Sequence, residues 1–492
     1  MVLLAVLLYF CFLYGISRLT SRKADNDTFY RANRRAPWYM VAFGMIGASI
    51  SGVTFVSVPG MVLTSQMTYL QVCLGFIVGY VVVAFVLLPL YYRLSLTSIY
   101  AYLGQRLGWQ SYQTGAWFFL LSKMSGSAVK FYVVCMILQQ FVFDPMGIPF
   151  LVNVVGMVLL VWLYTRRGGI GTLVFTDSFQ TLCLFTALIL IILQVISMMH
   201  LTIGEAVDVV KDSEMSRIFV FDDWKSPHHF WKQFLSGIFI VVVMTGLDQD
   251  MMQKNLTCKT LRDAQKNVMT SSLLSIVVNI LFLCLGAALL AYSGQTGFVL
   301  PVNEAGTVVP DKIFPSIAFS LSGFTAVCFV LGMVAAGYSS ADGTLTALTT
   351  TLCFDFLGFD KKESNTPAGI RTRRLVHVGF TFLYLLVILI FRPFHTQSLI
   401  DTLFDIAGFT YGPLLGLYTF GLFTRLQVRD RWVPLITVAS PVISFILKKY
   451  MPLWTGYHFG FEILLVNGLL TFIGLLLISK QKDNTKQYCN PS

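Results

Sequence analysis

The chain has 492 residues, of which 56% are hydrophobic and 12% are charged, and its formal net charge is +11. A soluble protein of this size carries roughly 25% charged residues, so the composition excludes an ordinary soluble domain and favours a membrane protein. The nine cysteines are an odd number without CxxC spacing, which argues against a disulfide framework or a zinc site.

Long apolar runs, nearly free of charge, follow one another along almost the whole chain. About 20 apolar residues at ~1.5 Å rise cross ~30 Å of hydrocarbon, and a helix satisfies its own backbone in lipid. The runs are too long for barrel strands. The sequence therefore predicts an all-α polytopic membrane protein with about thirteen transmembrane helices, at residues 1–19, 38–63, 69–92, 113–141, 147–165, 175–199, 230–250, 268–293, 314–356, 375–391, 397–424, 432–448 and 458–479.

The basic residues predict the orientation of the chain in the cell (inner) membrane. Of the 35 Lys and Arg residues, most fall in the loops after spans 1, 3, 5, 7, 9 and 11 and in the carboxyl-terminal tail. Basic loops stay in the cytoplasm, so we expect the amino terminus outside and the carboxyl terminus inside. This topology explains the net charge without a nucleic-acid partner. The first run lacks a basic n-region and a cleavage site, and we interpret it as a retained span.

No hydrophilic stretch is long enough to form a catalytic domain. We expect a single transmembrane domain over residues 1–479 and a polar cytoplasmic tail over residues 480–492. The outer loop after span 6 contains residues 203–215, whose pattern predicts a short amphipathic surface helix.

Span 2 is crowded with small residues. Glycines, serines and a threonine fill residues 43–55, and Pro59-Gly60 follows. Such a stretch favours close helix packing. It is also typical of a helix that breaks in mid-membrane and frees carbonyl oxygens for a hard cation. Both interpretations remain open for this span.

Spans 4, 6 and 7 carry charges that are costly in lipid. Span 4 has Lys123 and Lys130 on one face, of which Lys130 is the deeper and needs a cavity, a partner or a snorkelling path. Span 6 places Asp177 inside the inner boundary, where a cation, a proton relay or a local hydrogen bond would stabilise it. Span 7 ends in a charged stretch over residues 248–254, which we interpret either as solvated or as functional.

Span 9 has a face rich in oxygen. Ser339, Asp342 and Thr346 follow i, i+3, i+7 spacing, and Ser340 lies beside them. Stacked hydroxyl and carboxylate oxygens suit Na⁺. The alternatives are hydroxyls that bond back to their own helix and an Asp342 that faces water at a helix end.

No constellation of catalytic residues is present, so we expect no enzyme. The six histidines include no HExxH motif, and no Walker loop occurs. Without an ATP site, an ion gradient is the natural source of energy for transport.

At these residues the chain resembles the sodium:solute symporter family, which includes sodium/glucose, sodium/proline and bacterial sialic-acid symporters. The resemblance runs from about Phe29 to Phe423. The motifs that carry it, in family order, are Phe55 to Gly60; Gly168-Gly169 with Thr176 to Gln180; Asp248-Gln249 with Gln253-Lys254; Ala336 to Asp342 with Phe354-Asp355; and Tyr411 to Gly416 with Gly421.

The resemblance implies a LeuT-like fold with an inverted five-plus-five repeat. Repeat one covers about 38–199 and repeat two about 230–424, with span 1 at 1–19 and spans 12–13 at about 432–479 added. It also implies a sodium site between spans 2 and 9. The implied ligands are the carbonyl oxygens of Gly47, Ile50 and Ala336 and the hydroxyls of Ser339 and Ser340.

Bacterial sialic-acid symporters are similar in having a second sodium near the span 6 aspartate, here Asp177. Two span 9 serines assist there, but Asp342 and Gly343 stand at those positions, and Asp342 is a candidate substitute ligand. The substrate-binding residues implied by the resemblance are Ser51, Thr54 and Gln71, with Lys130 one turn beyond the position of the arginine that binds sialic acid.

The sequence thus predicts a secondary active transporter that couples inward sodium flow to uptake of a small polar solute by alternating access. The solute is a sugar, sialic acid, amino acid or carboxylate, and the coupling ion is sodium. The expected partners are the solute, sodium and the lipid bilayer; an oligomer is not required. The alternatives are a proton-coupled carrier, with Asp177 or Asp342 as relay, and a transporter-like solute sensor.

Overall fold

The structure, a computed structural model, describes residues 1–22, 25–34, 36–304, 306–359, 365–391 and 399–480. The tail predicted over residues 480–492 lies, apart from Lys480, outside the described residues. The regular elements are α1 (Val2–Thr20), α2 (Asn26–Arg31), α3 (Trp38–Ser49), α4 (Gly52–Ser65), α5 (Tyr69–Val82), α6 (Leu88–Arg93), α7 (Ala101–Arg106), α8 (Trp109–Leu138), α9 (Phe150–Gly168), α10 (Ile170–Met198), α11 (Ile203–Asp212), α12 (Phe230–Val241), α13 (Gln249–Asn255), α14 (Leu261–Thr296), α15 (Pro310–Leu321), α16 (Gly323–Thr351), α17 (Pro367–Phe391), α18 (Leu399–Phe423), β1 (Gln427–Val428), α19 (Val433–Thr455), α20 (Ile463–Leu477) and β2 (Ser479–Lys480).

The helices confirm the all-α membrane architecture. Within the described ranges, ten helices are long and apolar enough to cross a bilayer, and two bent pairs, α3 with α4 and α12 with α13, bring the total to as many as twelve. The thirteenth predicted run corresponds to α20, which has 15 residues and is shorter than a usual span. The count of thirteen therefore stays a prediction.

Helix boundaries differ from the sequence prediction at several runs. The run at 314–356 is not one helix, because the chain turns at Ser322, whose hydroxyl accepts a hydrogen bond from the Thr325 amide and starts α16 anew. The run at 268–293 extends over the 36 residues of α14. The predicted surface helix is confirmed as α11, which Thr202 caps.

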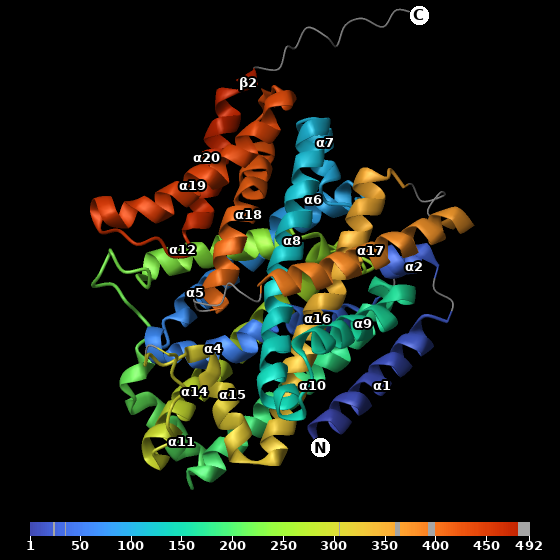
Figure 1. Ribbon diagram of the computed structural model, residues 1–492. Coiled ribbons are helices and arrows are strands. Elements are labelled where there is room, and N and C mark those ends of the chain that lie inside the picture. Colours follow the sequence, from blue (N-terminus) through green and yellow to red (C-terminus); the bar gives the residue numbers. More distant parts are fainter. Residues whose placement is uncertain (23–24, 35, 305, 360–364, 392–398, 481–492) are drawn as a thin grey trace, which may run out of the picture.

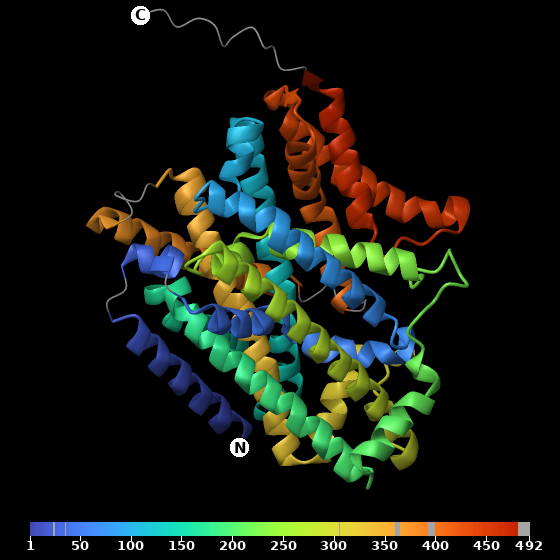
Figure 2. The same cartoon turned by 180° about the vertical axis from the view of Figure 1, so that it is seen from behind.

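The bent helices lie inside the molecule. The helix α10 packs against both α3 and α16, and α14 packs against α3 and α4. Figures 1 and 2 show α1 at the edge of the bundle, α19 and α20 together, and Met1 and β2 at opposite ends of the molecule. Each predicted repeat begins with one bent pair, as expected where two related halves meet at a central site.

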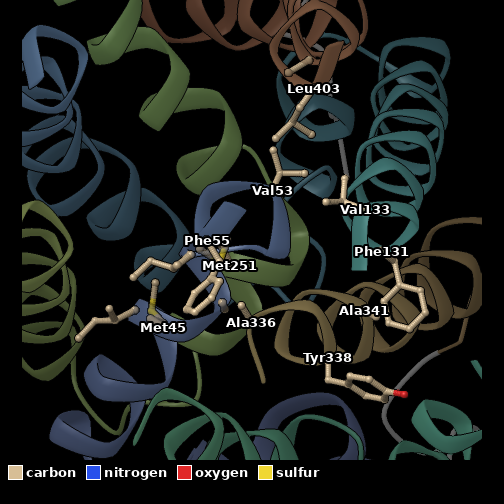
Figure 3. Packing of buried hydrophobic residues seen from close by; sticks show 14 of the residues in the cluster. Met45, Val53, Phe55, Phe131, Val133, Met251, Ala336, Tyr338, Ala341 and Leu403 are labelled. Carbon is tan, nitrogen blue, oxygen red and sulfur yellow. The ribbon is translucent and has the colours of Figure 1, made fainter. Parts of the chain in front are cut away.

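Apolar side chains fill the region where the bent helices meet. Met45 of α3, Phe55 of α4, Met251 of α13 and Ala336 of α16 are buried in one hydrophobic cluster, and Figure 3 shows them close together. Close packing of this kind fixes the relative positions of the helix ends.

Candidate functional site

The first bent pair breaks where the sequence predicted a break. The axes of α3 and α4 differ by 58°. Ile50 ends α3 in an extended conformation, and Ser51 caps α4 by accepting a hydrogen bond from the Thr54 amide. The last carbonyl groups of α3 therefore have no following turn to bond. Gly47 and Ile50, two of the predicted sodium ligands, lie at this helix end.

Small residues in α3 also serve packing. A Cβ atom at Gly47 would lie 2.2 Å from the Thr181 hydroxyl oxygen, and one at Gly44 would lie 2.9 Å from Asp177 Cβ. The glycines thus bring α3 against α10 and the Asp177 backbone. The packing and broken-helix interpretations of span 2 both hold.

The oxygen-rich face of α16 lies beside this break. Ala336, Ser339 and Ser340 are buried, and α16 contacts both α3 and α4. Ser339 does not bond back to its own helix; its hydroxyl donates to Asp177 Oδ1 at 3.0 Å. A hydroxyl that donates its hydrogen still offers its oxygen lone pairs to a cation. A hydroxyl does bond back to its own helix near the carboxyl end of α16, where the Thr349 hydroxyl donates to the Leu345 carbonyl oxygen.

The second bent pair places carboxylates at the centre of the molecule. The helices α12 and α13 differ in direction by 70°. Asp248 caps α13 by accepting hydrogen bonds from the amides of Asp250 and Met251, and it accepts a third from the Tyr411 hydroxyl at 2.6 Å. Asp248 and Asp250 are only 2% and 3% exposed. The solvated interpretation of this stretch is therefore wrong, because the helix break turns it into the core.

Five side chains form a buried chain of ion pairs, which we call the charged cluster. Lys123 Nζ lies 3.1 Å from Asp248 Oδ1 and 2.8 Å from Asp250 Oδ2. Lys254 Nζ lies 3.6 Å from Asp250 Oδ1 and 2.9 Å from Asp177 Oδ2. The charged cluster thus connects α8, α13 and α10 and ends at the carboxylate that holds Ser339.

Sequence reasoning missed the role of Lys254, which it counted among the basic residues of a cytoplasmic loop. The available signal was the polar stretch after Gly246 at the end of span 7. That stretch closes the first span of the predicted repeat two, as the small-residue stretch lies in the first span of the predicted repeat one.

Asp342 is buried and does not face water, so that alternative is wrong. Its carboxylate accepts hydrogen bonds from the Tyr164 hydroxyl at 2.8 Å and from the Gly343 amide at 2.5 Å. The neighbouring Gly343 leaves room for the charged cluster, because a Cβ atom there would lie 2.5 Å from Asp250 Oδ1.

A cavity of about 130 Å³ lies between the two breaks. Ser51, Thr54, Lys123, Lys130 and Ser340 are among its lining residues. Lys123 is held by the charged cluster. Lys130, in contrast, has no carboxylate within ion-pair distance in the part of the chain that the structure describes. Its ammonium is therefore available to a ligand.

Gln71 is not among the lining residues. Its amide nitrogen donates to Gln233 Oε1 and to the His228 carbonyl oxygen, and its amide oxygen accepts from the Val220 amide. Burial lowers the pKa of the His228 imidazole in the loop before α12, so the ring stays neutral at pH 7. Gln71 thus ties this loop to α5 and α12, and the prediction that it binds substrate is not supported.

Comparisons with known proteins identify the family. A model of the sodium:solute symporter family matches residues 29–425. The chain belongs to this family. It is 25% identical over 413 residues to the sodium/sialic acid symporter NanT of Aliivibrio fischeri, covering 82% of this chain and 79% of the relative. It is 24% identical over 426 residues to the human sodium/iodide cotransporter, covering 83% of this chain and 62% of that longer relative.

Solved structures share the fold. A substrate-bound, outward-open Na⁺-coupled sialic acid symporter superposes with a TM-score of 0.79 at 21% identity, covering 97% of this chain and 98% of that one. The transporter Mhp1, in a closed conformation, gives a TM-score of 0.54 at 14% identity, covering 92% and 93%. The family resemblance and the LeuT-like fold are confirmed. The protein is an integral membrane transporter that couples solute uptake to sodium, and it is not an enzyme.

Proposed function

We propose that this symporter uses inward sodium flow to drive uptake of a small polar solute across the cell membrane by alternating access, with its amino terminus outside and its carboxyl terminus in the cytoplasm. The observation that carries the proposal is the cavity between two broken helices, with Ser340 in its wall. Freed backbone groups, hydroxyls and an unpaired ammonium meet there, which is the arrangement that midplane binding requires.

Sodium would bind where the end of α3 meets α16. Its proposed ligands are the carbonyl oxygens of Gly47, Ile50 and Ala336 and the hydroxyls of Ser339 and Ser340. The carbonyl groups left without a following helical turn at the α3 break and the position of Ser339 support this set. An ion held by both helices would connect repeat one to repeat two, so its arrival and departure would bias the closure of one against the other.

The solute would bind in the adjacent cavity. Ser51 and Thr54 offer hydroxyls at the start of α4, and Lys130 offers a positive charge from α8. A cavity of about 150 Å³ accommodates a molecule the size of benzene, so the observed volume favours a small solute in this conformation. The proposed solute is a sugar, sialic acid, an amino acid or a carboxylate.

A thermal-shift screen of a solute library, with NaCl against choline chloride, tests the proposal. A solute that binds the folded protein raises its unfolding temperature, and a coupled solute should do so strongly only when sodium is present. Equal stabilisation in both salts would contradict sodium coupling. The double variant Ser339→Ala with Ser340→Ala should lose the sodium effect while retaining expression.

Proton coupling is the second candidate. Asp342 is buried and has no cation within 4 Å among the described residues, and a buried carboxylate without an ion pair is a candidate proton carrier. Uptake into proteoliposomes driven by a pH gradient in the absence of sodium would favour this mechanism.

A further inference from the structure

The Asp177 carboxylate already has a cation. Lys254 Nζ lies 2.9 Å from Asp177 Oδ2, and both side chains are nearly excluded from solvent, with 3% and 2% of their area exposed. The other carboxylate oxygen, Oδ1, accepts the Ser339 hydroxyl. Each of the two oxygens that a second sodium ion would need therefore already has a partner, and one of these partners is a full positive charge.

The ammonium is fixed in this position by the helix that carries it. The cap at Asp248 holds the start of α13, and near its end the Gln253 amide donates to the Tyr30 carbonyl oxygen at 2.6 Å and to the Thr350 hydroxyl at 3.1 Å. Asp250, 3.6 Å from Lys254 Nζ, adds a second negative charge. Withdrawal of the ammonium would leave the buried Asp177 carboxylate without an ion pair, which is strongly unfavourable.

The surroundings of Asp177 offer little else to a second sodium ion. Gly343 has no side-chain oxygen, and the Asp250 carboxylate occupies the space where one would project. The Asp342 carboxylate is already bonded to the Tyr164 hydroxyl and the Gly343 amide. A sodium ion bound at Asp177 would also lie within a few ångströms of the Lys254 ammonium and be repelled by it.

We infer that Lys254 is a tethered cation that takes the place of a second sodium ion at Asp177, so that this symporter binds and carries one sodium ion per cycle. The inference rests on the proposed sodium site between α3 and α16. Asp177 is then a positioning residue: neutralised by Lys254, it orients the Ser339 hydroxyl so that the oxygen lone pairs face the ion.

Equilibrium binding of radioactive sodium to the purified full-length chain tests this inference. The wild-type protein should bind one ion per protomer with a Hill coefficient of about 1. Lys254→Gln removes the tethered charge and should admit a second ion at Asp177, which raises the stoichiometry to two. Lys254→Arg keeps a fixed positive charge and should still bind one.

The outcomes separate this inference from the proposed function. A wild-type protein that binds no sodium overturns the proposed function itself. A wild-type protein that binds two ions, or a folded Lys254→Gln variant that still binds one, overturns only the role of Lys254. If the single variant does not fold, the wild-type stoichiometry decides: one ion per protomer supports the role of Lys254, and two ions overturn it.

Discussion

At the scale of single residues, the absence of a side chain at one position shapes the site as much as the side chains that are present. Gly343 contributes no side chain, and Asp250 uses the space next to it. Lys123 holds Asp250 on the opposite side, so this carboxylate cannot move away without losing an ion pair.

Gly343→Ala should therefore destabilise the protein. The new Cβ atom would lie 2.5 Å from Asp250 Oδ1, and overpacking in a closely packed core costs about 1–3 kcal/mol. The measurement is the free energy of unfolding from denaturant titration in detergent. Gly379→Ala, in α17, is the matched control, because nothing lies within 4 Å of its Cβ position and alanine favours the helix. Equal stability of the two variants would contradict the close contact.

Ser339 and Ser340 should differ in their effects on sodium affinity. Ser340→Ala removes one proposed ligand, whereas Ser339→Ala also takes from Asp177 the hydroxyl that donates to it. A hydrogen bond to a charged group contributes about 1.5–3 kcal/mol, so Ser339→Ala should weaken sodium binding more, by on the order of tenfold or greater.

The readout is the sodium concentration that gives half of the maximal thermal stabilisation. Ser444→Ala is the control, since Ser444 is buried in α19 and, among the described residues, its hydroxyl bonds only back to the Ser440 carbonyl oxygen. A wild-type sodium dependence in both site variants would place the ion elsewhere.

At the scale of elements, two helix breaks build the site, and a side chain caps each new helix. Ser51 caps α4 with a hydroxyl, and Asp248 caps α13 with a carboxylate. The two caps have different electrostatic consequences. The Asp248 cap also binds Lys123 and Tyr411, so it joins a helix end to α8 and α18.

Substitutions of Asp248 should separate the cap from the charge. Asn keeps an acceptor for the α13 amides but loses the ion pair, whereas Ala loses both. A lost helix cap costs about 0.5–2 kcal/mol, so Asp248→Ala should be less stable than Asp248→Asn by that amount, and Asp248→Asn less stable than the wild type. Thermal unfolding followed by circular dichroism measures the order. Thr202→Ala, which removes the cap of the surface helix α11, should leave sodium-dependent stabilisation unchanged.

At the scale of the whole molecule, helices far apart in the sequence meet around a charged centre. The charged cluster connects α10 and α8, which belong to the predicted repeat one, to α13 of the predicted repeat two. Because binding free energies are reciprocal, sodium should raise the affinity for the solute by the same factor as the solute raises the affinity for sodium.

The orientation of the molecule is the remaining prediction at this scale. The charge bias of the loops predicts an external amino terminus and a cytoplasmic carboxyl terminus. Green fluorescent protein fused after Ser492 should therefore fluoresce in bacterial cells, since it folds in the cytoplasm, while alkaline phosphatase at the same position should be inactive. The opposite pair of results would reverse the topology.

The features that the sequence predicted are those that depend on a short stretch of chain. Apolar run length implies helices because lipid offers no partner for backbone groups. The break in span 2 is visible because glycines and serines gather within a few residues, and the Ser339 face follows from helical spacing. The family motifs are likewise local, which is why they point to the correct fold.

The features that only the tertiary structure decided depend on which helices meet. The charged stretch at the end of span 7 was compatible with water or with the core, because charge alone does not tell where a helix bends. The bend places Lys254 against Asp177 and Asp250 beside Gly343. Likewise, the Gln71 side chain does not line the predicted substrate site, because its amide group is hydrogen-bonded to Gln233 and Val220. Ion pairs between distant segments form only when the helices pack together, and no local sequence pattern predicts them.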